Sequence, residues 1–174
     1  MKSTEFDLEI GFSLGSNLGD RLENLTAAKE CLLSFPEARL IEQSSVYETE
    51  PIGVRPEHAH LQFLNVVLII KSTWPVEPWL AKVGAVEKKL ARDRSEDRYA
   101  PRTIDIDILY AGDSCIDSGG LVVPHPLWAQ RRFVVEPLAE VRPDLILPGA
   151  GRTVRETLNA LPPGEQCVVF VKNW

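Results

Sequence analysis

The sequence predicts an α+β protein with a ferredoxin-like split βαβ core, in which helices flank an antiparallel sheet and make three layers. Segments with strand periodicity and segments with helical periodicity follow one another in the order β, α, β, β, α, β, and an irregular extension comes after them. No internal repeat or low-complexity tract divides the chain, so we expect one domain over residues 1–174.

The first strand and the first helix have clear patterns. Apolar residues alternate with polar or small ones from Phe6 to Leu14, as in a strand with one buried face. The residues 15–20 (GSNLGD) predict a turn, and Asp20 can cap the helix that follows. That helix keeps its apolar residues at helical spacing until Pro36: Leu22, Leu25, Ala28 and Leu32.

The next two strands differ in how deeply they are expected to be buried. A second strand is predicted over Arg39–Tyr47, and the segment 50–60 reads as a long irregular loop because prolines and a glycine interrupt it. The run Phe63–Ile70 is apolar and β-branched apart from Asn65, which indicates a central strand buried on both faces. An amide inside such a run needs a hydrogen-bonding partner.

The second half of the chain begins with a helix that opens at Pro75 or Pro78 and places Glu87 on its surface. Its apolar side is expected to consist of five residues: Trp79, Leu80, Val83, Val86 and Leu90. A strand that contains Asp105 and Asp107 follows and ends at Gly112. Shorter segments make up the extension: Leu121–Val123, a turn at 124–126, Arg131–Leu138, a weak helix over Val154–Leu161 and a last strand over Cys167–Val171.

The composition excludes several classes of protein. Charged residues make up 25% of the chain and apolar residues 44%, as in ordinary globular proteins, and no apolar stretch approaches the length of a membrane span. The formal net charge of -6 argues against a broad nucleic-acid surface. The absence of a stretch that could span a membrane leads us to expect a cytoplasmic location. The 3 cysteines are odd in number and widely spaced, which argues against a disulfide framework and a Cys-type zinc site, so free thiols are expected. We expect a monomer with neither nucleic acid nor membrane as a partner.

Two aspartates carry the main chemical signal. Residues i and i+2 of a strand share a face, so Asp105 and Asp107 lie side by side while the isoleucines around them take the other face. Carboxylates at such spacing repel unless a cation lies between them, and oxygen ligands alone suit Mg²⁺. Alternatively, the aspartates only accept hydrogen bonds from Arg102. Basic residues precede them, and these could bind a small polyanion or form a solvated face: Lys88, Lys89, Arg92, Arg94, Arg98 and Arg102.

Other candidate residues have two interpretations each. Asn65 and Phe63 could hold the amide edge and the ring of a heterocycle, or Asn65 could be satisfied by a neighbouring loop. His125 lies between two prolines, where it could touch phosphate or simply pack. The glycines of the turn at 15–20 fit neither of the common phosphate-loop patterns, so a tight turn is the better interpretation.

Several segments are informative in combination: LGSNLGD at 14–20, SSVYET at 44–49 with PIG at 51–53, FLN at 63–65, Glu87 with Arg92, PRTIDIDI at 101–108, VPHP at 123–126 and RRF at 131–133. Together they resemble the 6-hydroxymethyl-7,8-dihydropterin pyrophosphokinase family, and they occur in the family's order. The chain departs from the family pattern at Tyr99, Ala100, Gly84 and Gly120, while the final thirty residues match only loosely.

The resemblance implies transfer of the β,γ-pyrophosphoryl group of ATP to the pterin hydroxymethyl oxygen, which yields the pterin diphosphate and AMP in folate biosynthesis. It implies two Mg²⁺ ions bridged by Asp105 and Asp107, with Arg92 and Arg102 against the phosphates. The implied nucleotide contacts are: Glu87, Arg94, Ile108, His125 and Arg131. The implied pterin contacts are: Phe63 and Phe133 around the ring, Asn65 on its polar edge, and backbone groups near Thr49 and Ile52.

Two rival functions remain open from the residues alone. A metal-dependent phosphodiesterase or nuclease would also use paired aspartates with arginines. A non-catalytic ligand-binding module would need no metal, since Asp105 and Asp107 would then only accept hydrogen bonds from Arg102.

Overall fold

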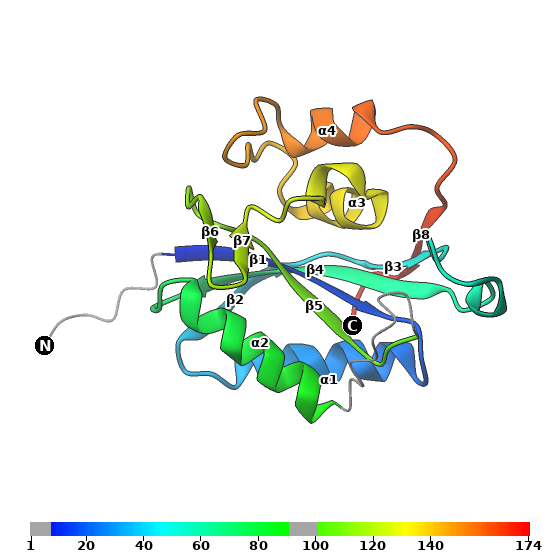
Figure 1. The fold of residues 1–174 in the computed structure, drawn as a ribbon, viewed down its shortest axis with the longest axis horizontal. Coiled ribbons are helices and arrows are strands. Elements are labelled where there is room, and N and C mark those ends of the chain that lie inside the picture. The colour runs from blue at the N-terminus through cyan, green and yellow to red at the C-terminus, as the bar shows by residue number, and fades with distance from the viewer. Residues whose placement is uncertain (1–7, 91–100) are drawn as a thin grey trace, which may run out of the picture.

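The computed structural model describes residues 8–90 and 101–174 of the chain. A 6-stranded sheet has the strand order β5-β1-β4-β3-β8, with β2 also paired to β4, and helices cover both of its faces (Figure 1). The predicted α+β class with three layers is confirmed. The strands of the main sheet are: β1 Leu8–Ser16, β2 Ala38–Gln43, β3 Val46–Thr49, β4 Phe63–Ser72, β5 Asp105–Ala111 and β8 Cys167–Val171.

Four α-helices form the outer layers of the described part of the chain: α1 Arg21–Leu33, α2 Glu77–Lys89, α3 Arg132–Val141 and α4 Val154–Ala160. Figure 1 shows α1 and α2 on one face of the sheet and α3 with α4 on the other. The pair β6 Ile116–Ser118 and β7 Leu121–Val123 makes a separate small sheet. Short 3-10 turns occur at Pro56–His58 and Trp128–Gln130.

The first helix begins where the sequence predicts it. The Asp20 side chain accepts a hydrogen bond from the backbone N–H of Glu23 at 3.0 Å, which satisfies one of the otherwise unpaired N–H groups of the first turn. Leu25, Ala28 and Leu32 are fully buried against the sheet. The helical spacing read from the sequence therefore identifies the face that packs.

The predicted strand over Arg39–Tyr47 is divided in the structure. β2 ends at Gln43 and β3 starts at Val46. Between them, the Ser44 backbone N–H still donates to the Val67 carbonyl oxygen of β4 at 2.9 Å, but the return bond goes to a side chain. The Ser44 hydroxyl accepts from the backbone N–H of Val67 at 2.9 Å. Ser45 donates from its backbone N–H and from its hydroxyl to the Glu140 carboxylate, at 3.0 and 2.8 Å.

The second helix requires a correction. Pro78 lies in the first turn of α2 as expected, but Glu87 is not a surface residue: it is 3% exposed. Its Oε1 accepts a hydrogen bond from the backbone N–H of Ile106 at 2.9 Å, and this bond holds the carboxylate under the edge of β5. Leu80, predicted to face the core, is 38% exposed.

The core has two parts, one on each face of the sheet. Phe12, Leu14 and Trp79 belong to the cluster under α1 and α2. Val67 and Ile69 face the opposite way and pack with residues of α3 and α4. A strand with apolar residues on both faces needs a cover on both sides, and the irregular extension of the sequence supplies the second cover.

Candidate active site

Four residues form a row across the sheet. Gly15 of β1 is paired with Asp105 of β5 on one side and with Asn65 of β4 on the other, and Asn65 is paired in turn with Tyr47 of β3. Directly paired residues of antiparallel strands point to the same face. Asp105 and Asn65 therefore lie on one face of the sheet, separated by a residue without a side chain, and this is the face that α3 covers.

The two aspartates have different neighbours. Arg102 donates from Nη1 to Oδ2 of Asp105 at 2.7 Å. Oδ2 of Asp107 lies 3.8 Å from His125 Nε2 and 3.9 Å from Arg131 Nη1. Both carboxylates are partly exposed, with 28% and 38% of the side-chain surface accessible, so they can still reach a ligand. The predicted side-by-side placement is confirmed.

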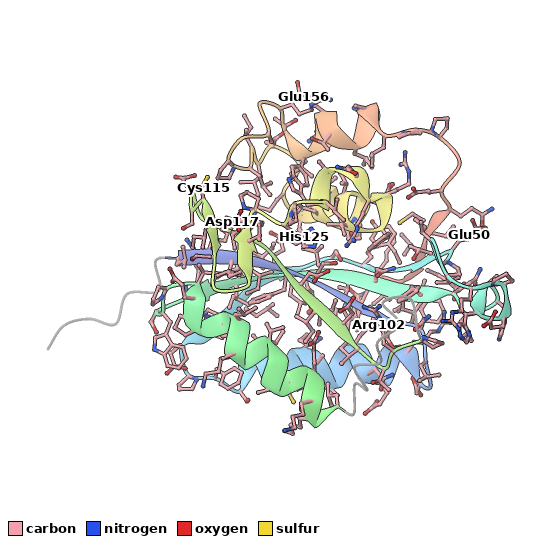
Figure 2. The ribbon with its side chains drawn as sticks, viewed as in Figure 1. Glu50, Arg102, Cys115, Asp117, His125 and Glu156 are labelled. Atoms are coloured by element: carbon pink, nitrogen blue, oxygen red, sulfur yellow. The ribbon has the colours of Figure 1, made fainter. Side chains whose placement is uncertain are left out.

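His125 is held in a defined orientation. Its backbone N–H donates to the carbonyl oxygen of Leu109 on β5 at 2.8 Å, and its Nδ1 accepts from the backbone N–H of Leu127 at 3.1 Å. In the neutral imidazole the proton consequently lies on Nε2, the atom nearest to Asp107. Figure 2 shows His125 between the sheet and α3, and Arg102 at the beginning of β5.

The turn after β1 also contributes to the site. Asn17 Oδ1 accepts from the backbone N–H of Arg102 at 2.8 Å, and the backbone N–H of Asn17 donates to the carbonyl oxygen of Arg102 at 3.2 Å. The sequence pattern indicates only a tight turn here. The structure shows that this turn fixes the backbone that carries Arg102, a contact between residues far apart in sequence that no local pattern reveals.

The amide side of the site centres on Asn65, which is 4% exposed. Its Nδ2 donates to the Thr49 hydroxyl at 2.6 Å. Phe63 precedes it by two residues on β4 and shares its face, while Phe133 extends from α3 with the Arg131 guanidinium 5.7 Å from its ring centre. Ile52 is 50% exposed in the segment between β3 and β4.

Two predicted nucleotide contacts, Ile108 and Glu87, have side chains that are engaged within the fold. Ile108 is buried in the cluster under α1 and α2, so its side chain faces away from the aspartates. The backbone N–H and C=O groups of Ile108 point away from β1, as those of Ile106 do. Only these backbone groups of Ile108 can therefore contact a ligand at the edge of β5. Glu87 is likewise occupied with Ile106. Arg92 and Arg94 lie outside the described residues, as do Tyr99 and Ala100.

Sequence reasoning missed Glu140 of α3. Its carboxylate accepts from the Tyr47 hydroxyl at 2.8 Å in addition to the two bonds from Ser45. Burial of the phenol and its hydrogen bond to Glu140 raise the pKa of Tyr47 above the ordinary range. Glu140 thus joins α3 to the strand beside Asn65, and no spacing in the sequence indicates this contact.

The donor set fits a hard cation that keeps part of its water shell. Among residues 8–90 and 101–174, no three His, Cys, Asp or Glu side chains gather to enclose an ion. Two carboxylates on one face leave positions for water and for phosphate oxygens, which is the usual arrangement for Mg²⁺ in phosphoryl-transfer sites.

His125 also lines a separate cleft of about 480 Å³ beside α4, whose lining includes neither Asp105 nor Asn65.

The fold and the site define a class: an α+β protein of the split βαβ type whose sheet presents paired carboxylates, cationic side chains and an amide with an aromatic ring on one face. The particular family follows from comparison with known proteins. The model of the 7,8-dihydro-6-hydroxymethylpterin-pyrophosphokinase (HPPK) family matches residues 11–143. The chain belongs to this family.

Relatives support the same assignment. The 2-amino-4-hydroxy-6-hydroxymethyldihydropteridine pyrophosphokinase of Methylorubrum extorquens is 38% identical over 150 residues, which cover 86% of this chain and 91% of the relative. The protein of the same name from Pseudomonas aeruginosa is 37% identical, covering 86% of this chain and 90% of the relative. The family resemblance read from the sequence is therefore confirmed.

Solved structures share the fold. A structure described as HPPK-DHPS in complex with substrates matches with a TM-score of 0.69 and 12% identity over 88% of this chain. A Plasmodium falciparum HPPK-DHPS structure with pterin and p-hydroxybenzoate matches with a TM-score of 0.69 and 14% identity over 91% of this chain. This chain spans 43% and 44% of those chains, which are longer.

Proposed function

We propose that the chain transfers pyrophosphate from ATP to 6-hydroxymethyl-7,8-dihydropterin and releases AMP, the reaction after which its family is named. One observation carries the proposal: the carboxylates and Asn65 share one face of the sheet, separated only by β1. Two strand spacings amount to about 10 Å. A flat ring at Asn65 can therefore present its hydroxymethyl group to a phosphate chain held at Asp105.

The metal requirement belongs to the proposal as well. Asp105 and Asp107 would hold two Mg²⁺ ions, which supply charge neutralisation for the triphosphate when they are bound. The protein's own part is to orient the two carboxylates, and it does so by placing them on one face of β5 with Arg102 and His125 at their sides.

The cationic side chains would complete the charge balance. Arg102 is anchored through Asn17 and lies beside Asp105, while Arg131 lies beside Asp107. In pyrophosphoryl transfer, the protein chiefly positions the two substrates and neutralises the charge of the phosphates, so no strong side-chain base is needed. The resemblance adds Arg92 against the transferring phosphates, and Glu87, Arg94, Ile108 and His125 as nucleotide contacts; Ile108 would contribute only its backbone.

Pterin recognition would combine stacking with a polar edge. Phe63 comes from the sheet and Phe133 from the helix layer above it, so a ring can lie between them. Stacking on aromatic rings contributes roughly 0.5–1.5 kcal/mol per pair beyond the buried area. Asn65 would read the polar edge, with backbone groups near Thr49 and Ile52, and a ring that left this amide unpaired would bind poorly.

One assay tests the proposal against its rivals. AMP formation from ATP is followed with and without the hydroxymethyl dihydropterin and with and without Mg²⁺. We expect AMP only when both are present. AMP formed equally well without the pterin would favour a metal-dependent hydrolase, and no AMP under any condition would leave a binding module.

The proposal includes a cellular setting. None of the helices in the described part of the chain has the length and apolar character to cross a membrane. Cys31, Cys115 and Cys167 are free thiols, as is usual in a reducing compartment. We therefore propose a cytoplasmic monomer that binds ATP and a pterin and does not bind nucleic acid or membranes.

A further inference from the structure

Gly15 occupies the centre of the row that joins Asp105 to Asn65. A Cβ atom added to Gly15 would lie 2.8 Å from Asn65 Oδ1 and 3.7 Å from Phe63 Cδ1. Real Cβ atoms essentially never approach another heavy atom closer than 3.0 Å. The two residues that such an atom would meet are those proposed to hold the pterin.

The backbone does not explain this glycine. Gly15 lies within the β1 ladder, paired on both sides, and it is absent from the glycines of this chain that have positive φ. Its conformation is therefore open to any residue. What excludes a side chain at this position is the amide oxygen of Asn65.

Asn65 cannot easily move aside. Its side chain is buried and its Nδ2 donates to the Thr49 hydroxyl at 2.6 Å, so turning the amide would break this bond and leave a buried donor unpaired. With one N–H held by Thr49, the amide can still offer Oδ1 and its second N–H to a ligand. Oδ1 is the atom that lies over Gly15.

We propose that Gly15 is a specificity-determining residue for the pterin, an inference that rests on the proposed function of Asn65. The bare backbone at Gly15 leaves Oδ1 of Asn65 accessible to an N–H on the edge of a flat nitrogen heterocycle. A methyl group there would displace the amide from Thr49 and would narrow the space beside Phe63. Nucleotide binding at the aspartates would not depend on this methyl group.

The first test is Gly15→Ala, measured by calorimetry with the hydroxymethyl dihydropterin and, separately, with a non-hydrolysable ATP analogue and Mg²⁺. We expect the pterin Kd to rise at least about tenfold, because a buried amide loses its ordered partners, while the Kd of the ATP analogue stays unchanged. An unchanged pterin Kd overturns the proposal.

A double-mutant cycle identifies the cause. Asn65→Ala removes the atom with which the new methyl group collides, so adding Gly15→Ala to Asn65→Ala should cost no further pterin affinity. Additive losses overturn the proposal. If Asn65→Ala alone leaves pterin binding intact, the proposed function of Asn65 has failed; if Asn65→Ala weakens binding and Gly15→Ala does not, only the inference about Gly15 has failed.

A matched control lies on the same strand. A Cβ on Gly11 would lie 2.3 Å from the Tyr110 ring, so Gly11→Ala should lower the melting temperature without touching Asn65. We expect its pterin Kd to remain that of the wild type, and an equal loss would mean general damage to β1 and overturn the proposal. If Gly15→Ala alone fails to fold, the variant that combines it with Asn65→Ala must fold like Asn65→Ala; failure there overturns it too.

Discussion

At the scale of single residues, Asp107 provides the sharpest test of the proposed chemistry. Its carboxylate is 38% exposed, and among the described residues it lies 3.8 Å from His125 Nε2 and 3.9 Å from Arg131 Nη1. Ion pairs that are this open to solvent contribute little to folding stability. We expect Asp107→Ala to lower kcat for AMP formation at least about a hundredfold, because the charge proposed to position Mg²⁺ is lost. Thermal melts should coincide with those of the wild type.

The control for this variant is Asp117→Ala, an exposed aspartate on β6. It should retain wild-type kcat. An unfolded Asp107→Ala protein would instead make this aspartate structural and would remove the support for a metal site.

Arg102 offers a second test at this scale. Its backbone is fixed by Asn17, so Arg102→Ala removes the guanidinium beside Asp105 without releasing the turn. We expect kcat to fall far more than pterin affinity does, since the proposed role of the guanidinium is to contact the phosphates and not the ring. Steady-state kinetics beside calorimetry measure both, and Arg155→Ala, an exposed residue of α4, is the control. An equal fall in both quantities would contradict the assigned role.

At the scale of secondary-structure elements, α3 carries Phe133 and Arg131 near its first turn and Glu140 near its last. Glu140→Ala leaves the donors of Ser45 and Tyr47 without their acceptor. We expect the free energy of unfolding to fall by about 1–3 kcal/mol in urea titrations. The pterin Kd should rise more than the Kd of an ATP analogue, since α3 carries Phe133, one of the two rings proposed to stack on the pterin.

Another helix provides the comparison. Thr153 and Glu156 form a reciprocal capping box at the start of α4, and Thr153→Ala should cost about 1 kcal/mol of stability. It should not change the pterin Kd. If it weakened the pterin as much as Glu140→Ala does, the effect of Glu140 would reflect general loss of stability and not the position of α3.

At the scale of the whole molecule, one network joins three elements. The Arg142 guanidinium, just after α3, donates to both carboxylate oxygens of Glu9 on β1 at 3.0 and 3.1 Å, and the Tyr110 hydroxyl of β5 donates to Glu9 at 2.6 Å. Burial favours the protonated carboxyl, but the hydrogen bonds from Arg142 and Tyr110 outweigh it and lower the pKa of Glu9.

This network predicts a pH dependence of stability. Because the pKa of Glu9 is lower in the folded protein than in the unfolded chain, its stabilising effect is fully present above the unfolded value and is lost as pH falls through the folded value. As the pH is lowered from neutral into the acid range, the free energy of unfolding of Glu9→Gln should therefore fall less than that of the wild type. Urea titrations at each pH measure this quantity. The control is Glu57→Gln, because Glu57 forms an exposed ion pair with Arg55. Its free energy of unfolding should change with pH as that of the wild type does.

Local patterns in the chain predict most of the helices and strands and the chemical groups that each one carries. Period-2 alternation placed Asp105 and Asp107 on one face, and Asp20 marked the start of α1. The family motifs are local strings as well, which is why the family could be recognised before the fold. The expectation of one domain over residues 1–174 stays a prediction.

The contacts between those elements follow from their packing in three dimensions. The burial of Glu87 under β5, the division of the second strand by Ser44 and Ser45, and the approach of Gly15 to Asn65 all depend on strand register or on helix packing. Periodicity reports the orientation of a side chain relative to its own backbone. It carries no information about the opposing residue, because that partner is selected by packing between segments far apart in the chain.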